Sequence, residues 1–335
     1  MLKTKNIVRG YVSGVLSGAT WGLDTVILGV AMSMVPFVED GVLVSGGAIL
    51  ASALHDVFSA GWLIIYMTKK GRLRELFPAL KTRDGRFCAL AAVFGGPLAM
   101  TFYTLAIATG GAALTANVTA IYPILGTAMA VLILKEKTGF QTWVGLVLCV
   151  MGICVMGHVP SEGAAVNVVG GIVFALVAAI GWATEGVVCG YGMKDGRIDP
   201  LLALLIRELT SGVVYMLLVV PIFLKGFGNV CHGVSAVFSS LSCGLLIVGT
   251  ALVGMASFGL WYTAIDNIGA AKGLCLNVTY SFWAVVLTVL LSVVFPSRFS
   301  GSVTLTIALG SVFMLGGVAI ATLCHDKSGA KGSDL

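Results

Sequence analysis

Residues 17–24 read Ser-Gly-Ala-Thr-Trp-Gly-Leu-Asp, and residues 178–185, about 160 positions later, read Ala-Ala-Ile-Gly-Trp-Ala-Thr-Glu. Each stretch places an acid three residues after a tryptophan within an otherwise apolar run. The triplet Asn-Val-Thr at 117–119 returns as Asn-Val-Thr at 277–279, at nearly the same offset. Self-similarity at a fixed offset indicates that the chain contains two copies of one structural unit.

The composition indicates that lipid surrounds these two units. Hydrophobic residues make up 58% of the 335 and charged residues only 10%, with a mean hydropathy of +1.02, whereas a soluble domain carries about 25% charge. A membrane helix needs about 20 mostly apolar residues. On that measure we predict ten transmembrane helices, near residues 10–35, 41–68, 87–108, 111–134, 140–158, 167–191, 199–224, 240–266, 271–295 and 301–324.

The predicted fold class is therefore an all-α polytopic membrane protein made of two inverted five-helix repeats. Residues 1–158 form the first repeat, residues 159–324 the second, and residues 325–335 a cytoplasmic tail. Because five is an odd number, the second repeat must enter the membrane upside down. Inverted repeats place a substrate site near the midplane and allow alternating access, which is typical of transporters.

The basic residues support this helix count and give an orientation. Seventeen of the 20 Lys and Arg residues fall in alternate connections and at the two termini. The opposite side holds only Lys225 and Arg298, while Arg207 lies inside a span. Cytoplasmic segments collect basic residues, so we expect a multi-pass protein of the inner membrane with both termini in the cytoplasm.

Several motifs resemble those of a known superfamily. They are Phe-Tyr-Thr-Leu-Ala at 102–106, Ile-Tyr-Pro at 121–123, Leu-Lys-Glu-Lys at 134–137 and Leu-Trp-Tyr-Thr-Ala at 260–264. With them the chain resembles the drug/metabolite transporter (DMT) superfamily in its ten-helix form with two EamA-type repeats. The second repeat departs from the pattern at 296–298, Pro-Ser-Arg, where the family often shows an acid.

Ionisable groups inside a span are costly and mark functional sites. Asp24 and Glu185 each share a helix face with the preceding tryptophan, Trp21 or Trp182. A quaternary ammonium has no N–H to donate, so aromatic faces hold it best, with a carboxylate supplying longer-range charge. The Trp-plus-acid pair resembles the bacterial choline-permease branch of the superfamily. The expected substrate-binding residues are Trp21, Asp24, Tyr103, Asn117, Trp182, Glu185, Trp261, Tyr262, Asn277, Tyr280 and Trp283.

A second set of residues is expected to serve proton coupling or gating: Glu185, Asp24, His55, Asp56, Arg207 and Glu208. Glu185 is singled out as a proton carrier, because no basic residue lies within a turn of it. Each assignment has a structural alternative. The tryptophans could fill interhelical space, the acids could pair with His55, Arg207 or Lys272, and the asparagines could join helices through hydrogen bonds.

The sequence predicts a secondary active transporter of a small organic cation, choline or a related quaternary ammonium. An exporter of amino acids, aromatic metabolites or drugs with the same fold is the alternative. An enzyme is not expected, because the spans carry no metal-ligand histidine cluster and no Ser/His/Asp arrangement. We expect no cofactor, no metal and no nucleic-acid partner. The expected partners are a small-molecule substrate and membrane lipid, with the oligomeric state left open.

Overall fold

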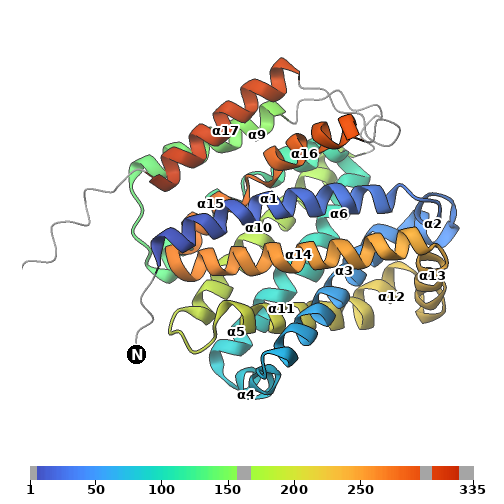
Figure 1. Ribbon diagram of the computed structural model, residues 1–335. Coiled ribbons are helices and arrows are strands. Elements are labelled where there is room, and N and C mark those ends of the chain that lie inside the picture. The colour runs from blue at the N-terminus through green and yellow to red at the C-terminus, as the bar shows by residue number, and fades with distance from the viewer. Residues whose placement is uncertain (1–5, 157–166, 295–303, 324–335) are drawn as a thin grey trace, which may run out of the picture.

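The computed structural model describes residues 6–156, 167–294 and 304–323, and these form helices joined by short connections (Figure 1). Nine of the described helical segments are long and apolar enough to cross a membrane, which makes the chain a polytopic membrane protein. They are Ile7–Met32, Gly41–Lys69, Arg83–Gly110, Leu114–Leu134, Val168–Met193, Pro200–Phe223, Leu241–Ile268, Ala270–Val294 and Leu305–Leu323. The predicted fifth span corresponds to α9 (Phe140–Met156), whose 17 residues lie at the short end of the membrane range.

Five of these segments are single continuous helices: α1 (Ile7–Met32), α3 (Gly41–Lys69), α10 (Val168–Met193), α14 (Leu241–Ile268) and α17 (Leu305–Leu323). Their first turns are held by short polar side chains. Asn6 accepts from the backbone N–H of Arg9 before α1, and Asp40 accepts from two backbone N–H groups at the start of α3. These caps satisfy donors that would otherwise be left unpaired at a helix start.

The other long segments change their winding along their length. The third comprises α5 (Arg83–Val93), the π-helical η2 (Phe94–Met100) and α6 (Thr101–Gly110), with Pro97 inside η2. The sixth comprises α11 (Pro200–Val214), the π-helical η4 (Tyr215–Val219) and α12 (Val220–Phe223). A π-helical turn leaves the ordinary bonding pattern and is common at functional sites.

The duplicated Asn-Val-Thr triplets mark two helix interruptions. In the fourth segment, α7 (Ala112–Thr119) ends on the first triplet, and the chain continues as α8 (Tyr122–Met129) and η3 (Ala130–Leu134). In the eighth, α15 (Ala270–Asn277) ends within the second triplet, and α16 (Tyr280–Val294) begins just after it. Each restarted helix begins with a tyrosine, Tyr122 or Tyr280. The sequence repeat therefore coincides with a repeated break in the backbone helix.

The helices pack in recurring pairs. α1 lies along α14 and against α15 and α16, while α10 lies along α5, η2 and α6 and against α7 and α8. α9 and α17 form a separate pair along one edge of the molecule (Figure 1). The backbones of this pair approach closely at glycines: a Cβ on Gly145 would lie 2.5 Å from the carbonyl oxygen of Gly317, and one on Gly152 would lie 2.5 Å from that of Gly310. Small residues commonly allow such contact in membranes.

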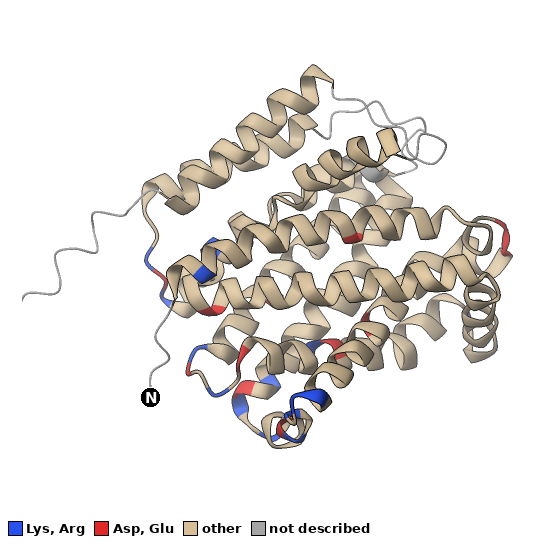
Figure 2. Cartoon of the chain, in the orientation of Figure 1, with Lys and Arg blue, Asp and Glu red and all other residues tan. Residues whose placement is uncertain are grey.

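Short helices and charged residues occupy the two ends of the bundle. α2 (Val35–Glu39) and α13 (Phe227–Ser239) lie at one end. The opposite end, near the N-terminus, carries η1 (Leu73–Glu75), α4 (Leu76–Lys81) and most of the Lys and Arg residues visible in Figure 2. Arg72 at this end bonds both Glu75 and Asp199, and these bonds raise the pKa of Arg72 and lower the pKa of Glu75.

Candidate functional site

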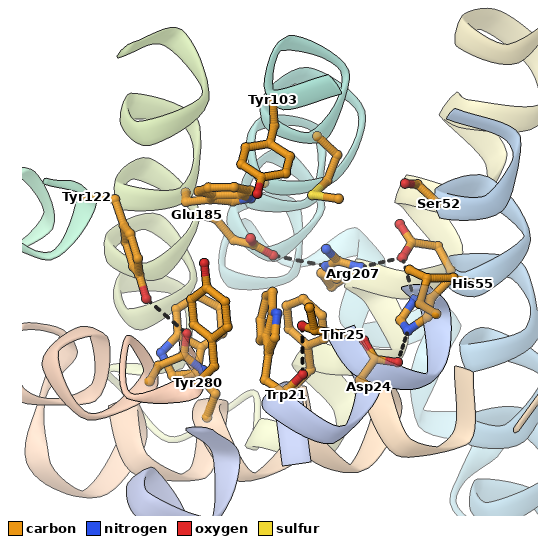
Figure 3. A pocket seen from close by; sticks show the side chains of 18 of the residues that line it. Trp21, Asp24, Thr25, Ser52, His55, Tyr103, Tyr122, Glu185, Arg207 and Tyr280 are labelled. Carbon is orange, nitrogen blue, oxygen red and sulfur yellow. Dashed lines mark hydrogen bonds and ion pairs between the residues drawn. The ribbon is translucent and has the colours of Figure 1, made fainter. Parts of the chain in front are cut away.

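A cavity of about 260 Å³ lies among α1, α3, α6, α8, α10, α11 and α14, close to the two helix interruptions. Eight of the eleven residues predicted to bind substrate line it: Trp21, Asp24, Tyr103, Trp182, Glu185, Trp261, Asn277 and Tyr280. Sequence positions as distant as 21 and 280 thus meet around one space (Figure 3).

The other three predicted substrate residues are not among the lining side chains. Tyr262 stands behind the wall and donates a hydrogen bond to Glu185 at 3.3 Å. Asn117, on α7, uses its backbone oxygen to accept a weak bond from Cys154, at 3.9 Å. Trp283 packs against Phe282, with ring centroids 5.4 Å apart. Tyr262 therefore contacts the site from behind, through Glu185 and through the rings of Trp261 and Phe258.

Aromatic rings form two groups across the cavity. Trp21 packs against Phe258 at 4.8 Å and Tyr280 at 5.8 Å between ring centroids. Trp182 packs against Tyr103 at 5.2 Å and Tyr122 at 6.0 Å. Figure 3 shows Tyr103 on one side of the open space and Trp21 with Tyr280 on the other. Each tryptophan of the duplicated motif therefore belongs to its own aromatic group.

The polar wall of the cavity is organised around Arg207. Its Nε donates to Glu185 Oε1 at 2.9 Å, and its Nη1 donates to Asp56 Oδ1 and Glu208 Oε2, both at 3.0 Å. The guanidinium carbon lies 4.2 Å from the centre of the Phe258 ring, within the range of a cation–π contact. Three carboxylates and one aromatic face therefore surround this single cation.

This geometry corrects the expectation that Glu185 stands without a basic neighbour. Arg207 lies 22 positions away in sequence, on the next membrane helix, and reaches the carboxylate directly. The two side chains meet because α10 and α11 enclose the same cavity. The structural alternative, in which the acids of the spans pair with His55 and Arg207, describes the observed contacts.

A second group of polar contacts continues from Asp56 towards α1. His55 lies between two acids, with Nδ1 3.4 Å from Asp56 Oδ1 and Nε2 3.3 Å from Asp24 Oδ1. Thr250 on α14 also donates to Asp24, and Ser211 donates to Asp56. All six residues of the predicted coupling set thus form one connected network, although Glu208 does not line the cavity.

The network contains more acids than bases. Among the residues that the structure describes, the bases that pair with Asp24, Asp56, Glu185 and Glu208 are Arg207 and His55. The side chains of all six are at most 12% exposed. If every acid is ionised, two negative charges remain in excess even when His55 is protonated. Because an uncompensated charge in a membrane protein costs several kcal/mol, the site favours protons or an added cation.

Glycines provide the space that these buried groups occupy. A Cβ on Gly95, in η2, would lie 1.7 Å from Glu185 Oε2, and a Cβ on Gly254 would lie 2.2 Å from His55 Nε2. Both distances are shorter than any real Cβ contact, so each charged side chain fills the place of a missing side chain. The Gly-Gly-Pro run at 95–97 is the sequence signal for this close approach.

Three lining aromatics, Tyr122, Tyr215 and Phe258, were absent from the predicted site. Tyr122 begins α8 and donates to Asn277 Oδ1 at 3.1 Å, which joins the two helix interruptions. Phe258 lies between Trp21 and the guanidinium of Arg207. Tyr122 belongs to the Ile-Tyr-Pro motif, so its position after the first Asn-Val-Thr triplet was a usable signal. Nothing local distinguishes Phe258 from the other phenylalanines of the chain.

An all-helical membrane-spanning architecture around a buried charged cavity defines the class: a polytopic membrane protein with an internal polar site. Residues 8–157 match the model of the EamA-like transporter family, which confirms the resemblance to the DMT superfamily for this part of the chain. The chain is also 27% identical over 285 residues to Protein LicB of Haemophilus influenzae, covering 85% of this chain and 89% of that protein.

A solved crystal structure shares the fold. It is 19% identical in sequence, superposes with a TM-score of 0.65, and the match covers 95% of this chain and 96% of the other. The agreement therefore extends over both halves of the chain, whereas the family match covers the first half.

Proposed function

We propose that the protein is a secondary active transporter of a small organic cation, choline or a related quaternary ammonium. The cation binds between the two aromatic groups, and the excess carboxylates of the network supply the compensating charge. The observation that carries this proposal is the combination of Trp21 and Trp182 with a buried network in which the acids outnumber the bases. Alternating access moves the cavity between the two sides of the membrane.

The proposed architecture is ten transmembrane helices in two inverted repeats, 1–158 and 159–324. The pairing of the helices supports it, because exchanging the two halves turns the most extensive helix contacts into other observed contacts. The exchange replaces α1 by α10, α3 by α11, and α14 by the segment that contains α5 and α6. The contact of α1 with α14 then corresponds to that of α10 with α5 and α6, and the contact of α3 with α14 corresponds to that of α11 with α5. The glycine contacts of α9 and α17 obey the same exchange, since an offset of 165 converts Gly145 and Gly152 into Gly310 and Gly317.

We place the N- and C-termini in the cytoplasm and the protein in the inner membrane. The support is the basic asymmetry of the connections, together with the cluster of Lys and Arg at the N-terminal end of the bundle (Figure 2). Cytoplasmic ends of membrane proteins collect such residues.

The chemistry of the cavity favours a cation over the alternative cargo of an exporter. A zwitterionic amino acid needs a free cationic group for its carboxylate, and Arg207 would be the available guanidinium. Asp56, Glu185 and Glu208 already surround that guanidinium. An added carboxylate would therefore enter a site that is already rich in negative charge.

The same network is the proposed place of proton coupling and gating. Protons on its acids and the substrate cation both neutralise the excess charge, so binding one reduces the need for the other. Glu185 links the network to the cavity, because it lines the cavity and bonds Arg207 and Tyr262.

The test is a binding titration of choline and its uncharged isostere, in which carbon replaces nitrogen, against purified protein. A cation–π contact contributes about 0.5–2 kcal/mol per ring, so Trp182→Leu should weaken choline binding roughly 2- to 30-fold. Trp182→Phe should lose less, because it keeps an aromatic face. The matched control is Trp283→Leu, since Trp283 does not line the cavity. Equal affinity of the wild type for choline and the isostere would refute the cation site.

A further inference from the structure

A second cavity, of about 150 Å³, lies towards the N-terminal end of the bundle. Its lining residues are Leu134, Lys135, Glu136, Gly190, Met193, Lys194, Ile265, Asp266, Gly269 and Ala270. The short helix α15 connects the two cavities, because its last residue, Asn277, lines the first and its first residue, Ala270, lines the second. Eight residues of α-helix span only about 12 Å, so the partition is thin.

Leu274 lies at the centre of this partition and is fully buried. It packs onto two glycines from neighbouring helices: a Cβ on Gly126 would lie 2.2 Å from its Cδ1, and a Cβ on Gly186 would lie 2.9 Å from its Cδ2. The leucine therefore fills space that both helices leave open by lacking a side chain. Such close apolar packing blocks passage between the two cavities.

Glu136 fixes the other end of α15. Its Oε1 accepts from the backbone N–H of Ala270 at 2.7 Å, and its Oε2 accepts from that of Ala271 at 3.1 Å. The residue before α15 is Gly269, which has a φ of 90° and no side chain that could cap the helix. The first N–H groups of α15 therefore depend on an acceptor from elsewhere in the chain. Glu136 comes from the first half of the chain and α15 from the second, so the contact ties the two halves together.

The main cavity extends away from this contact. Leu28, Gly29 and Met32 line it, and these residues lie at the end of α1 remote from the N-terminus. The structure is thus closed at the N-terminal end, where Glu136 and Leu274 lie. The matching connection of the second half reads Pro-Ser-Arg at 296–298, without an acid, so the sequence supplies this carboxylate at one end alone.

We propose that α15 is the inner gate of the transporter, with Leu274 as its plug and Glu136 as its latch. This inference rests on the proposed transport function. Opening requires the carboxylate of Glu136 to release the two N–H groups, which frees α15 to move and lifts Leu274 from Gly126 and Gly186. The second cavity then becomes continuous with the main one.

Cys275 is a native reporter of this movement. It lies on α15 beside the plug and is 1% exposed, whereas Cys231 on α13 is exposed. The experiment measures alkylation of both thiols by a maleimide in detergent micelles, read by peptide mass spectrometry. Glu136→Gln keeps the shape but removes the charge and one acceptor. It should speed Cys275 alkylation about tenfold, equivalent to about 1.4 kcal/mol, and leave Cys231 unchanged.

Two further variants keep the test decisive. Glu39→Gln, an exposed carboxylate at the opposite end of the bundle, should leave the rate at Cys275 unchanged. Gly186→Ala presses a Cβ against Leu274 while Glu136 stays intact, so it should also speed the reaction. If Glu136→Gln and Gly186→Ala both lower the melting temperature while the folded proteins alkylate at the wild-type rate, α15 is a structural element and the gate is refuted.

The alkylation test of the gate and the binding test of the substrate can succeed or fail independently. Faster alkylation in a protein that does not bind choline supports the gate and refutes the cation. Choline binding with an unchanged Cys275 rate supports the cation and refutes the gate.

Discussion

Gly95→Ala tests whether the Glu185–Arg207 contact organises the site. The new methyl group would lie 1.7 Å from Glu185 Oε2 and 2.0 Å from its Cδ, and no rotation of a methyl group relieves such a contact. The carboxylate must leave its place, which breaks the 2.9 Å bond to Arg207 and the 3.3 Å bond from Tyr262. One methyl group therefore disconnects the network from the cavity.

The size of the effect follows from two opposing contributions. Breaking one partner of a buried ion pair costs about 3–5 kcal/mol, while replacing glycine by alanine inside a helix returns up to about 1 kcal/mol. The net loss of about 2–4 kcal/mol corresponds to a fall in melting temperature on the order of 10 °C. Choline affinity should fall with it, because Glu185 no longer faces the cavity.

The assay is thermal unfolding in detergent together with a choline titration at a temperature where the variant is folded. Gly249→Ala is the matched control, since Gly249 also lies within a membrane helix but its Cβ would meet no atom within 4 Å. If Gly95→Ala unfolds and binds choline as Gly249→Ala does, the displaced carboxylate is unimportant and the reasoning fails.

Three further predictions concern topology, packing and coupling. Cysteine labelling with an impermeant reagent should find residues 69–86 and 225–238 on opposite sides of the membrane, and labelling of both from one side would refute the inverted topology. Gly317→Ala should destabilise the protein by about 1–3 kcal/mol, because the new methyl group would contact the α9 backbone. The neighbouring Gly316 should tolerate alanine, since its Cβ would meet nothing within 4 Å. Equal melting temperatures of the two variants would contradict the close packing. Glu185→Gln should abolish uptake driven by an imposed pH gradient while choline binding stays measurable, and an unchanged pH dependence of transport would exclude a proton on this carboxylate.

Much of the architecture could be predicted from the sequence, because membrane helices are recognisable by their length and apolar composition. The duplicated tryptophan-plus-acid motif also located two of the elements around the cavity, α1 and α10. The helix break at each Asn-Val-Thr triplet was not predicted, because both segments read as continuous apolar runs. A helix interruption depends on which backbone groups find partners in neighbouring helices, and that is a tertiary property.

The partners of the buried charges could not be predicted for a similar reason. A search within one turn of Glu185 finds no base, because spacing along a helix says nothing about the helix across the cavity. Arg207 was identified as an intramembrane charge, yet its three carboxylates come from α3, α10 and α11. The rotation of each helix about its axis decides which side chains meet, and packing at glycines such as Gly95 sets that rotation.

The shared guanidinium also constrains how the protein can be made. Asp56 enters the membrane with α3, early in synthesis, but Arg207 arrives with α11, 151 positions later. Until then Asp56 has only His55 as a basic neighbour among the contacts it makes in the finished structure. A nascent chain that stops after its first half therefore leaves Asp56 in lipid without its guanidinium partner, which costs several kcal/mol. The charged members of the network are therefore all present only once α11 has been inserted, so the ion pairs of Arg207 form late in synthesis.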